Sequence, residues 1–127
     1  MNPEIKQLWI DALRSDQYIQ GNNYLKYDLE GTTYHCCLGV LCDVYQKQTG
    51  KSIETTSRIS RTDSFPKEVY LLDGRSAFLP IAVRLWADLD CSDPVIGTIE
   101  EQKNATSWND NKKATFNEIA NLIDACL

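Results

Sequence analysis

The sequence lacks several features that would place it in a broad class. None of its apolar runs approaches the roughly 20 residues that span a bilayer, so we expect no membrane anchor. Residues 1–4 carry no basic and apolar leader of the signal-peptide type, which favours the cytoplasm. A single histidine and the lack of C-x₂-C spacing argue against a zinc or iron–sulfur site, and no glycine-rich phosphate loop occurs. We therefore expect neither a metal nor a cofactor.

Composition and charge define the general type of protein. With 43% hydrophobic and 24% charged residues in 127 positions, the chain has the composition of one folded domain, residues 1–127. The net charge of −5 excludes broad electrostatic binding to DNA or to an anionic membrane. A small anionic ligand stays compatible with this charge, because a local pocket needs only one or two arginines.

Apolar spacing predicts three main helices. The first has one apolar face at a period of 3.6 residues, formed by Ile5, Leu8, Trp9, Ala12 and Leu13. Asn2 can cap its start. Residues 37–48 predict a central helix with a wide apolar face, and Gly39 inside it indicates a close contact. Residues 115–118 form a Thr-Phe-Asn-Glu capping box, which begins a C-terminal helix. A shorter helix is expected from Pro80 to about Leu89.

Two hairpins are predicted between these helices. Their strands are residues 24–29, 32–36, 69–72 and 75–78. Glu30-Gly31 connects the first pair, and Asp73-Gly74, a strong signal for a type I′ turn, connects the second. Residues 51–65 are polar and predict a loop or a weak strand. The expected fold class is α+β, with a small, mainly antiparallel sheet of two hairpins packed by the N-terminal, central and C-terminal helices.

The segment 34–42, Tyr-His-Cys-Cys-Leu-Gly-Val-Leu-Cys, contains three of the five cysteines and the only histidine. A thiol at the start of a helix could serve as a nucleophile, as in papain-like enzymes. That chemistry needs an imidazole supplied from elsewhere in the fold, whereas His35 directly precedes Cys36. Cysteine is among the most buried residue types, so packing is the favoured role of Cys36 and Cys37. Five is an odd number of cysteines, and free thiols are expected.

Polar and aromatic residues of the predicted loops are the candidates for a binding site, since loops often carry function. The candidate ligand-binding residues are Arg14, Tyr18, Gln20, Trp108, Asn109 and Asp110. A pocket between the two loops would place a guanidinium on a phosphate, an aromatic face on a base and the Asn-Asp pair on ribose hydroxyls. A plainer alternative is that the tryptophan closes an edge of the core and the Asn-Asp pair forms a turn.

Several strings together resemble a family of small proteins encoded by bacteriophages and prophages. The most specific is Cys-Cys-Leu-Gly-Val-Leu-Cys-Asp at residues 36–43. Asn-Asp at 109–110, followed by Phe-x-x-Ile-Ala-x-x-Ile at 116–123, supports it. Weaker matching strings occur at residues 12–15, 79–80 and 86–87. The resemblance supplies no catalytic residues, and it implies a phage origin and action in the cytoplasm of the infected bacterium.

These observations lead to three alternative functions. The favoured one is a phage-encoded, non-catalytic binding protein that counters host defence by sequestering a small nucleotide-type immune signal. The second is a cysteine-dependent hydrolase that acts on such a signal or on an amide bond. The third is an inhibitor that binds a host protein directly. The sequence is also compatible with a homo-oligomer, and it does not identify the ligand.

Overall fold

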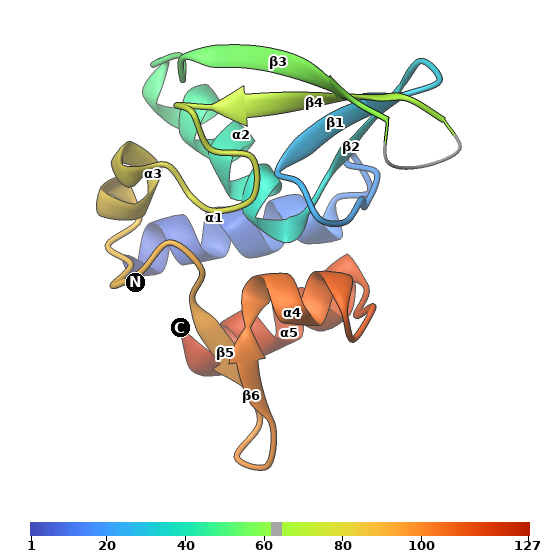
Figure 1. Ribbon diagram of the computed structural model, residues 1–127. Coiled ribbons are helices and arrows are strands. Elements are labelled where there is room, and N and C mark those ends of the chain that lie inside the picture. The colour runs from blue at the N-terminus through green and yellow to red at the C-terminus, as the bar shows by residue number, and fades with distance from the viewer. Residues whose placement is uncertain (62–64) are drawn as a thin grey trace.

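The computed structural model describes residues 1–61 and 65–127 and has the predicted α+β fold (Figure 1). The helices are α1 (Pro3–Arg14), α2 (Cys37–Thr49), α3 (Ile81–Trp86), α4 (Ala105–Asp110) and α5 (Phe116–Cys126). The strands are β1 (Lys26–Leu29), β2 (Thr32–His35), β3 (Thr55–Ser60), β4 (Lys67–Leu72), β5 (Val95–Gly97) and β6 (Gln102–Asn104). Within the described residues, no helix is long and apolar enough to cross a membrane.

The main sheet has four antiparallel strands in the order β2-β1-β4-β3, and β5 pairs with β6 in a separate hairpin. The pair β1–β2 is the hairpin predicted around Glu30-Gly31, and its register places Lys26 opposite His35. Figure 1 shows α2 between this sheet and α1, with α5 packed on α1. The central helix therefore contacts both the sheet and the helical part of the molecule.

The hairpin predicted around Asp73-Gly74 is correct in its turn and in its first strand, residues 69–72, which lie within β4. Both residues have positive φ angles, 52° and 76°, as the predicted turn requires. Residues 76–78 form bends and not the predicted return strand. The physical reason is that β4 is a central strand, with β1 on one edge and β3 on the other, so neither edge is free for a returning strand.

The partner of β4 in the second hairpin comes from the segment 51–65. Strand β3 occupies Thr55–Ser60, so the weak-strand alternative holds for that part of the segment. It lies at the edge of the sheet and exposes all of its side chains except that of Ser60, which explains its weak apolar signal. Residues 62–64 of the same segment lie outside the described residues.

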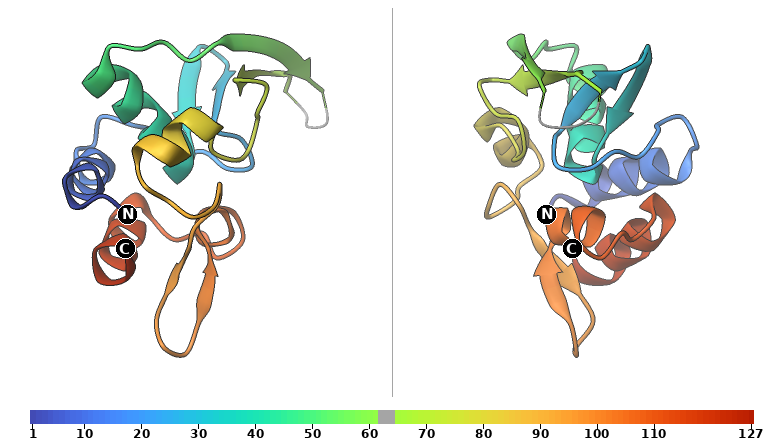
Figure 2. Two further views of the ribbon diagram at one scale, coloured as in Figure 1. Left: turned by 90° about the vertical axis from the view of Figure 1, so that its left-hand side faces the viewer. Right: turned by 45° about the vertical axis from the view of Figure 1, so that its right-hand side comes forward.

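Two short elements in the last third of the chain are absent from the sequence prediction. They are the β5–β6 hairpin, which projects from the body of the molecule (Figure 2), and the six-residue helix α4. Residues 108–110, predicted as a loop, are the last turn of α4. Strands of three residues and a helix of six are too short to show a period in the sequence, so the apolar pattern carried no signal for them.

The first turn of the central helix α2 lies directly against the backbone of Leu25. A β-carbon placed on Gly39 would lie 1.8 Å from the carbonyl oxygen of Leu25, so the close contact predicted at this glycine is confirmed. The indole nitrogen of Trp9 donates to the carbonyl oxygen of Cys37 at 2.9 Å, which ties α1 to the first turn of α2. Both contacts lie in the core, and they fix the position of α2 between its neighbours.

The first and last helices begin at the caps that the sequence predicts. The Asn2 side chain accepts hydrogen bonds from the amides of Glu4 and Ile5 at the start of α1. Thr115 and Glu118 form the capping box at the start of α5. Since each cap satisfies backbone donors that would otherwise need water, both helix starts are well defined.

Candidate functional site

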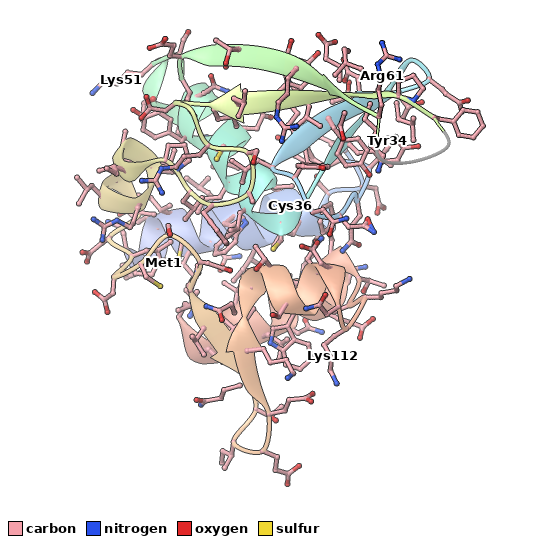
Figure 3. All side chains as sticks on the ribbon, in the orientation of Figure 1. Met1, Tyr34, Cys36, Lys51, Arg61 and Lys112 are labelled. Atoms are coloured by element: carbon pink, nitrogen blue, oxygen red, sulfur yellow. The ribbon has the colours of Figure 1, made fainter. Side chains whose placement is uncertain are left out.

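The three cysteines of the 34–42 segment are buried in the core. Burial raises the pKa of the Cys36 thiol to about 12, and it raises the pKa values of Cys37 and Cys42 as well. Figure 3 places Cys36 in the interior of the molecule. All five cysteines are free, and only Cys91 and Cys126 are exposed. These properties support a packing role for the thiols of the segment.

Neither a thiol–imidazole pair nor a metal cluster is found in the part of the chain that the structure describes. The imidazole of His35 packs edge-on against Tyr18, with ring centroids 5.2 Å apart, and no hydrogen bond joins it to a cysteine. No group of three His, Cys, Asp or Glu residues is arranged to hold a metal ion there. A nucleophilic cysteine would therefore have no base beside it in this conformation.

Asn109, a candidate ligand-binding residue, lies in the core with only 4% of its surface exposed. Its Oδ1 accepts hydrogen bonds from Gln20 Nε2 at 3.0 Å and from the amide of Cys37 at 3.2 Å. Its Nδ2 donates to the carbonyl oxygen of Gly21 and to Asp110 Oδ1, both at 2.8 Å. Both polar atoms thus make two hydrogen bonds each, and the side chain joins α4 to α2 and to the loop at Gln20-Gly21.

Gln20 and Asp110 belong to the same internal clasp. Gln20 Nε2 also donates to the carbonyl oxygen of Ala114 at 2.8 Å, and its Oε1 accepts from the amide of Phe116 at 3.1 Å. Asp110 Oδ1 accepts from the amide of Asn23 at 3.0 Å. Three of the six candidate residues therefore meet, and their hydrogen bonds are made to other parts of the protein. We call this group of Gln20, Asn109 and Asp110 the amide clasp.

Trp108 and Arg14 lie apart from the amide clasp. The indole nitrogen of Trp108 donates to the carbonyl oxygen of Ile96 at 2.9 Å and ties α4 to β5. The guanidinium of Arg14 donates to Asn121 Oδ1 at 2.6 Å on the exposed surface between α1 and α5. Because each side chain ties a different pair of elements, the six candidates do not converge on one pocket.

Tyr18, the last candidate, belongs to a polar network on α2. Its hydroxyl donates to Asp43 and accepts from Lys47 Nζ at 3.1 Å, while Lys47 Nζ pairs with Asp43 Oδ2 at 3.0 Å. Burial raises the pKa of Tyr18, and the hydrogen bond to Asp43 raises it further. Burial alone would raise the pKa of Asp43, but the hydrogen bonds from Tyr18 and Lys47 outweigh it and lower that pKa. Asp43 is therefore ionised at neutral pH.

Asp43 also borders a small cavity of about 130 Å³ between α2 and the sheet. Its lining residues are Lys26, His35, Gly39, Cys42, Asp43, Gln46, Thr55 and Leu72, and we call it the His35 cavity. Four of them come from α2 at the helical spacing i, i+3, i+4 and i+7, so one face of the helix lines the cavity. Lys26 and His35 come from directly opposed positions of β1 and β2.

Four side chains of the His35 cavity have polar atoms without a hydrogen-bond partner among the described residues. Asp43 uses Oδ2 for Tyr18 and Lys47, which leaves Oδ1 unused. Gln46 accepts a hydrogen bond from a backbone amide through Oε1, which leaves Nε2 unused. The ring nitrogens of His35 and the ammonium of Lys26 make no hydrogen bond within the described chain. Among the described residues, no side-chain nitrogen or oxygen without a hydrogen-bond partner is sealed from solvent, so these groups remain accessible to a ligand.

The charges at the His35 cavity balance. Burial and the positive charge of Lys26 lower the pKa of His35 to about 4, so the imidazole is neutral at physiological pH. A neutral imidazole has one donor and one acceptor nitrogen. The ammonium of Lys26 and the carboxylate of Asp43 carry opposite charges. The cavity therefore offers donors and acceptors without net charge, which suits a neutral polar group such as the edge of a nucleobase or an amide.

The polar residues of this cavity could have been found in the sequence. A two-residue turn at Glu30-Gly31 fixes the register of the predicted hairpin and places residue 26 opposite residue 35. The spacing of Asp43 and Gln46 places both on the face of the predicted helix that carries Gly39. What no local pattern supplies is the packing of that helix face against that end of the sheet, which is a tertiary contact.

The structure is thus an α+β domain that contains a buried amide clasp and a small polar cavity. The chain belongs to the family described as Domain of unknown function (DUF8296), whose model matches residues 1–127. Comparisons with curated proteins and with solved structures find no match. The family match covers the whole chain, so the amide clasp and the His35 cavity both lie within the family's domain.

Proposed function

We propose that this protein is a non-catalytic binding protein that sequesters a small nucleotide-type signal, with the base of the ligand in the His35 cavity. One observation carries the proposal: four side chains with unused hydrogen-bonding atoms, Lys26, His35, Asp43 and Gln46, converge on one small cavity. The edge of a nucleobase presents neighbouring donors and acceptors and carries no charge. Such an edge would satisfy this set without burying an unpaired charge.

The positions of the unused atoms suggest separate roles for them. Lys26 Nζ and Gln46 Nε2 would donate to a carbonyl oxygen or a ring nitrogen of the base. Asp43 Oδ1 would accept from an exocyclic amine, while Tyr18 holds the other carboxylate oxygen in place. The volume of about 130 Å³ is too small for a whole nucleotide, so the sugar and phosphates would lie outside the cavity.

Burial of the thiols supports capture of the ligand over its hydrolysis. Cys42 is the only cysteine among the residues that line the His35 cavity, and burial raises its pKa. A thiol is a much weaker nucleophile than a thiolate, so attack from this position at neutral pH would be slow. The cysteine-dependent hydrolase is therefore the less favoured function.

The biological setting of the proposal rests on the resemblance of the sequence strings at 36–43 and 109–123 to proteins of bacteriophages and prophages. We propose that the protein is phage-encoded, acts in the cytoplasm of the infected bacterium and removes a signal that host defence requires. A protein that removes a signal by binding needs no turnover. It must instead be present at a concentration comparable with that of the signal.

Depletion of a ligand from a cell extract tests this function. The purified protein is incubated with the small-molecule extract of bacteria whose defence signalling is active, and the unbound molecules are separated by filtration. We expect one nucleotide to be depleted from the filtrate and to reappear with unchanged mass after the protein is heat-denatured. Recovery of a cleaved product would instead support the hydrolase, and an undepleted nucleotide pool would contradict the proposal.

A matched pair of variants tests the location of the base. Gln46→Glu keeps the oxygen that accepts from the Ile53 amide but replaces the Nε2 donor with an acceptor. Gln48→Glu makes the same change of charge at an exposed position of the same helix. We expect the first variant to lose depletion and the second to retain it, with similar melting temperatures. Equal depletion by both variants would place the base elsewhere.

A second candidate function, inhibition of a host protein by direct binding, is favoured by one observation. Ile99 is fully exposed, at 101%, in the loop of the β5–β6 hairpin that projects from the body of the molecule (Figure 2). A hydrogen bond from the Thr98 amide to the carbonyl oxygen of Glu101, 2.9 Å long, closes that loop. Co-purification of one host protein with the wild type but not with Ile99→Asp would support this function.

A further inference from the structure

A second hollow, of about 350 Å³, lies on the surface near α3. Its lining residues are Arg75, Leu79, Ile81, Arg84, Cys91 and Ser92, and we call it the arginine hollow. It shares no lining residue with the His35 cavity. Two guanidinium groups therefore border one hollow in a chain with a net charge of −5.

Neither guanidinium of the arginine hollow forms an ion pair within the described residues. The chain contains 18 acidic residues and 13 basic ones, so carboxylate partners are plentiful. Arg84 donates to the carbonyl oxygen of Asp90 at 3.0 Å, which orients its guanidinium without neutralising the charge. The side chain of Arg75 makes no hydrogen bond in the described structure. Both positive charges are thus available to an anion.

The backbone on both sides of the hollow is held in place by hydrogen bonds. Arg75 exchanges two of them with Leu72 across the turn, at 2.8 and 3.0 Å. The carbonyl oxygen of Arg84 accepts from the amide of Leu89 at 3.0 Å. The amide of Leu79 donates to the carbonyl oxygen of Ser92 at 3.0 Å and joins the two walls. A ligand would therefore meet a wall that is already ordered, which lowers the entropic cost of binding.

We propose that the arginine hollow binds a phosphate-bearing small molecule, with the phosphate between Arg75 and Arg84. A guanidinium presents a planar set of donors that fits phosphate oxygens in pairs, and two of them match the double charge of a phosphate group. Ile81, half exposed, supplies an apolar surface for the carbon part of the ligand. This site is additional to the His35 cavity and does not depend on the binding of a base there.

Isothermal titration calorimetry with pyrophosphate at low salt tests the site. We expect Arg75→Ala and Arg84→Ala each to weaken binding at least tenfold, with unchanged melting temperatures. Arg58→Ala removes the same charge from an exposed position of β3 and serves as the matched control. Arg75→Lys should weaken binding several-fold, because the lysine keeps the charge and loses the paired donors. Equal loss in Arg58→Ala and Arg75→Ala, or no binding by the wild type, would overturn the proposal.

Two further arms identify the ligand and separate this site from the His35 cavity. Tighter binding of adenosine diphosphate than of pyrophosphate would show that the organic part also contacts the hollow, and equal binding would show recognition of phosphate alone. The Gln46→Glu variant should bind pyrophosphate as the wild type does. Loss of pyrophosphate binding in that variant would contradict a separate site, whereas failure of base capture alone would leave the arginine hollow unaffected.

Discussion

The carbonyl oxygen of Leu25 lies 1.8 Å from the position that a β-carbon on Gly39 would occupy. The same oxygen accepts a hydrogen bond from the amide of Cys36 at 3.2 Å. The approach of helix α2 to the sheet is thus set by backbone contact at its first turn. Because Gly39 also lines the His35 cavity, this contact fixes one wall of the candidate site.

We predict that Gly39→Ala destabilises the protein by about 2–3 kcal/mol, because the added methyl group must push the Leu25 backbone away. The higher helix propensity of alanine, worth about 1 kcal/mol, is outweighed by this clash. Urea denaturation measures the change, and Gln48→Ala, at an exposed position of α2, is the control. A Gly39→Ala protein as stable as the wild type would show that α2 can move without loss.

Two asparagines near the end of α4, Asn109 and Asn111, should differ in their contribution to stability, because only Asn109 belongs to the amide clasp. Asn109→Ala leaves the amide of Cys37 and Nε2 of Gln20 without their buried acceptor, so we expect a loss of about 3 kcal/mol. Asn111→Ala, at an exposed position just after α4, should change the stability by less than about 0.5 kcal/mol. Thermal unfolding of both variants tests this difference. Equal melting temperatures would mean that Asn109 does not hold these segments together.

Native alkylation should separate the cysteines into two classes. We expect iodoacetamide at neutral pH to label only the exposed Cys91 and Cys126, because the other thiols are buried and their pKa values are raised. In urea all five should react. Mass spectrometry after a short reaction counts and locates the labels. Rapid labelling of Cys36, Cys37 or Cys42 in the folded protein would instead support the cysteine-dependent hydrolase.

The low pKa of His35 predicts a specific loss of stability in mild acid. Its pKa is about 4 in the folded protein, below the ordinary value of 6.5, so the folded state favours the neutral ring. The unfolded chain takes up the proton first. The contribution of the neutral His35 ring to the free energy of unfolding is therefore complete above pH 6.5. It is lost as the pH falls towards 4, and the loss is on the order of 2 kcal/mol.

Urea denaturation between pH 7 and pH 4.5 measures this loss. His35 is the only histidine, and the lowered pKa values of Asp28 and Asp43 act below this window. The variant His35→Gln should have a flatter dependence of stability on pH. The same slope in the variant and the wild type would assign the loss to other groups.

The fold was predictable where local signals agree. The caps of α1 and α5, the wide apolar face of α2 and the turn at Glu30-Gly31 each depend on neighbouring residues, and all four are found in the structure. The partner of β4 was not predictable. A strand whose side chains are almost all exposed resembles a loop, and the Asp73-Gly74 turn indicates a hairpin without showing that β4 already has two partners.

The candidate site was predictable in its residue types and not in its location. Gln20 and Asn109 have the polar groups of a ligand site, but in the fold their hydrogen bonds join α4 to α2 and to the loop at Gln20-Gly21. His35 lies in the distinctive segment 34–42, and Asp43 directly follows it. Their shared cavity arises only when α2 packs on the sheet, and the sequence spacing of these residues does not contain that contact.

We propose that a nucleotide-type ligand contacts the His35 cavity, and NMR signals of the single histidine can detect this contact. With ¹⁵N-labelled protein, the two imidazole nitrogens are recorded before and after addition of the nucleotide recovered from the heated complex. Our account predicts that both signals shift, that one tautomer becomes fixed, and that Gln48→Glu shows the same shifts while Gln46→Glu shows none. Imidazole signals that stay unchanged while the nucleotide is bound would contradict the claim.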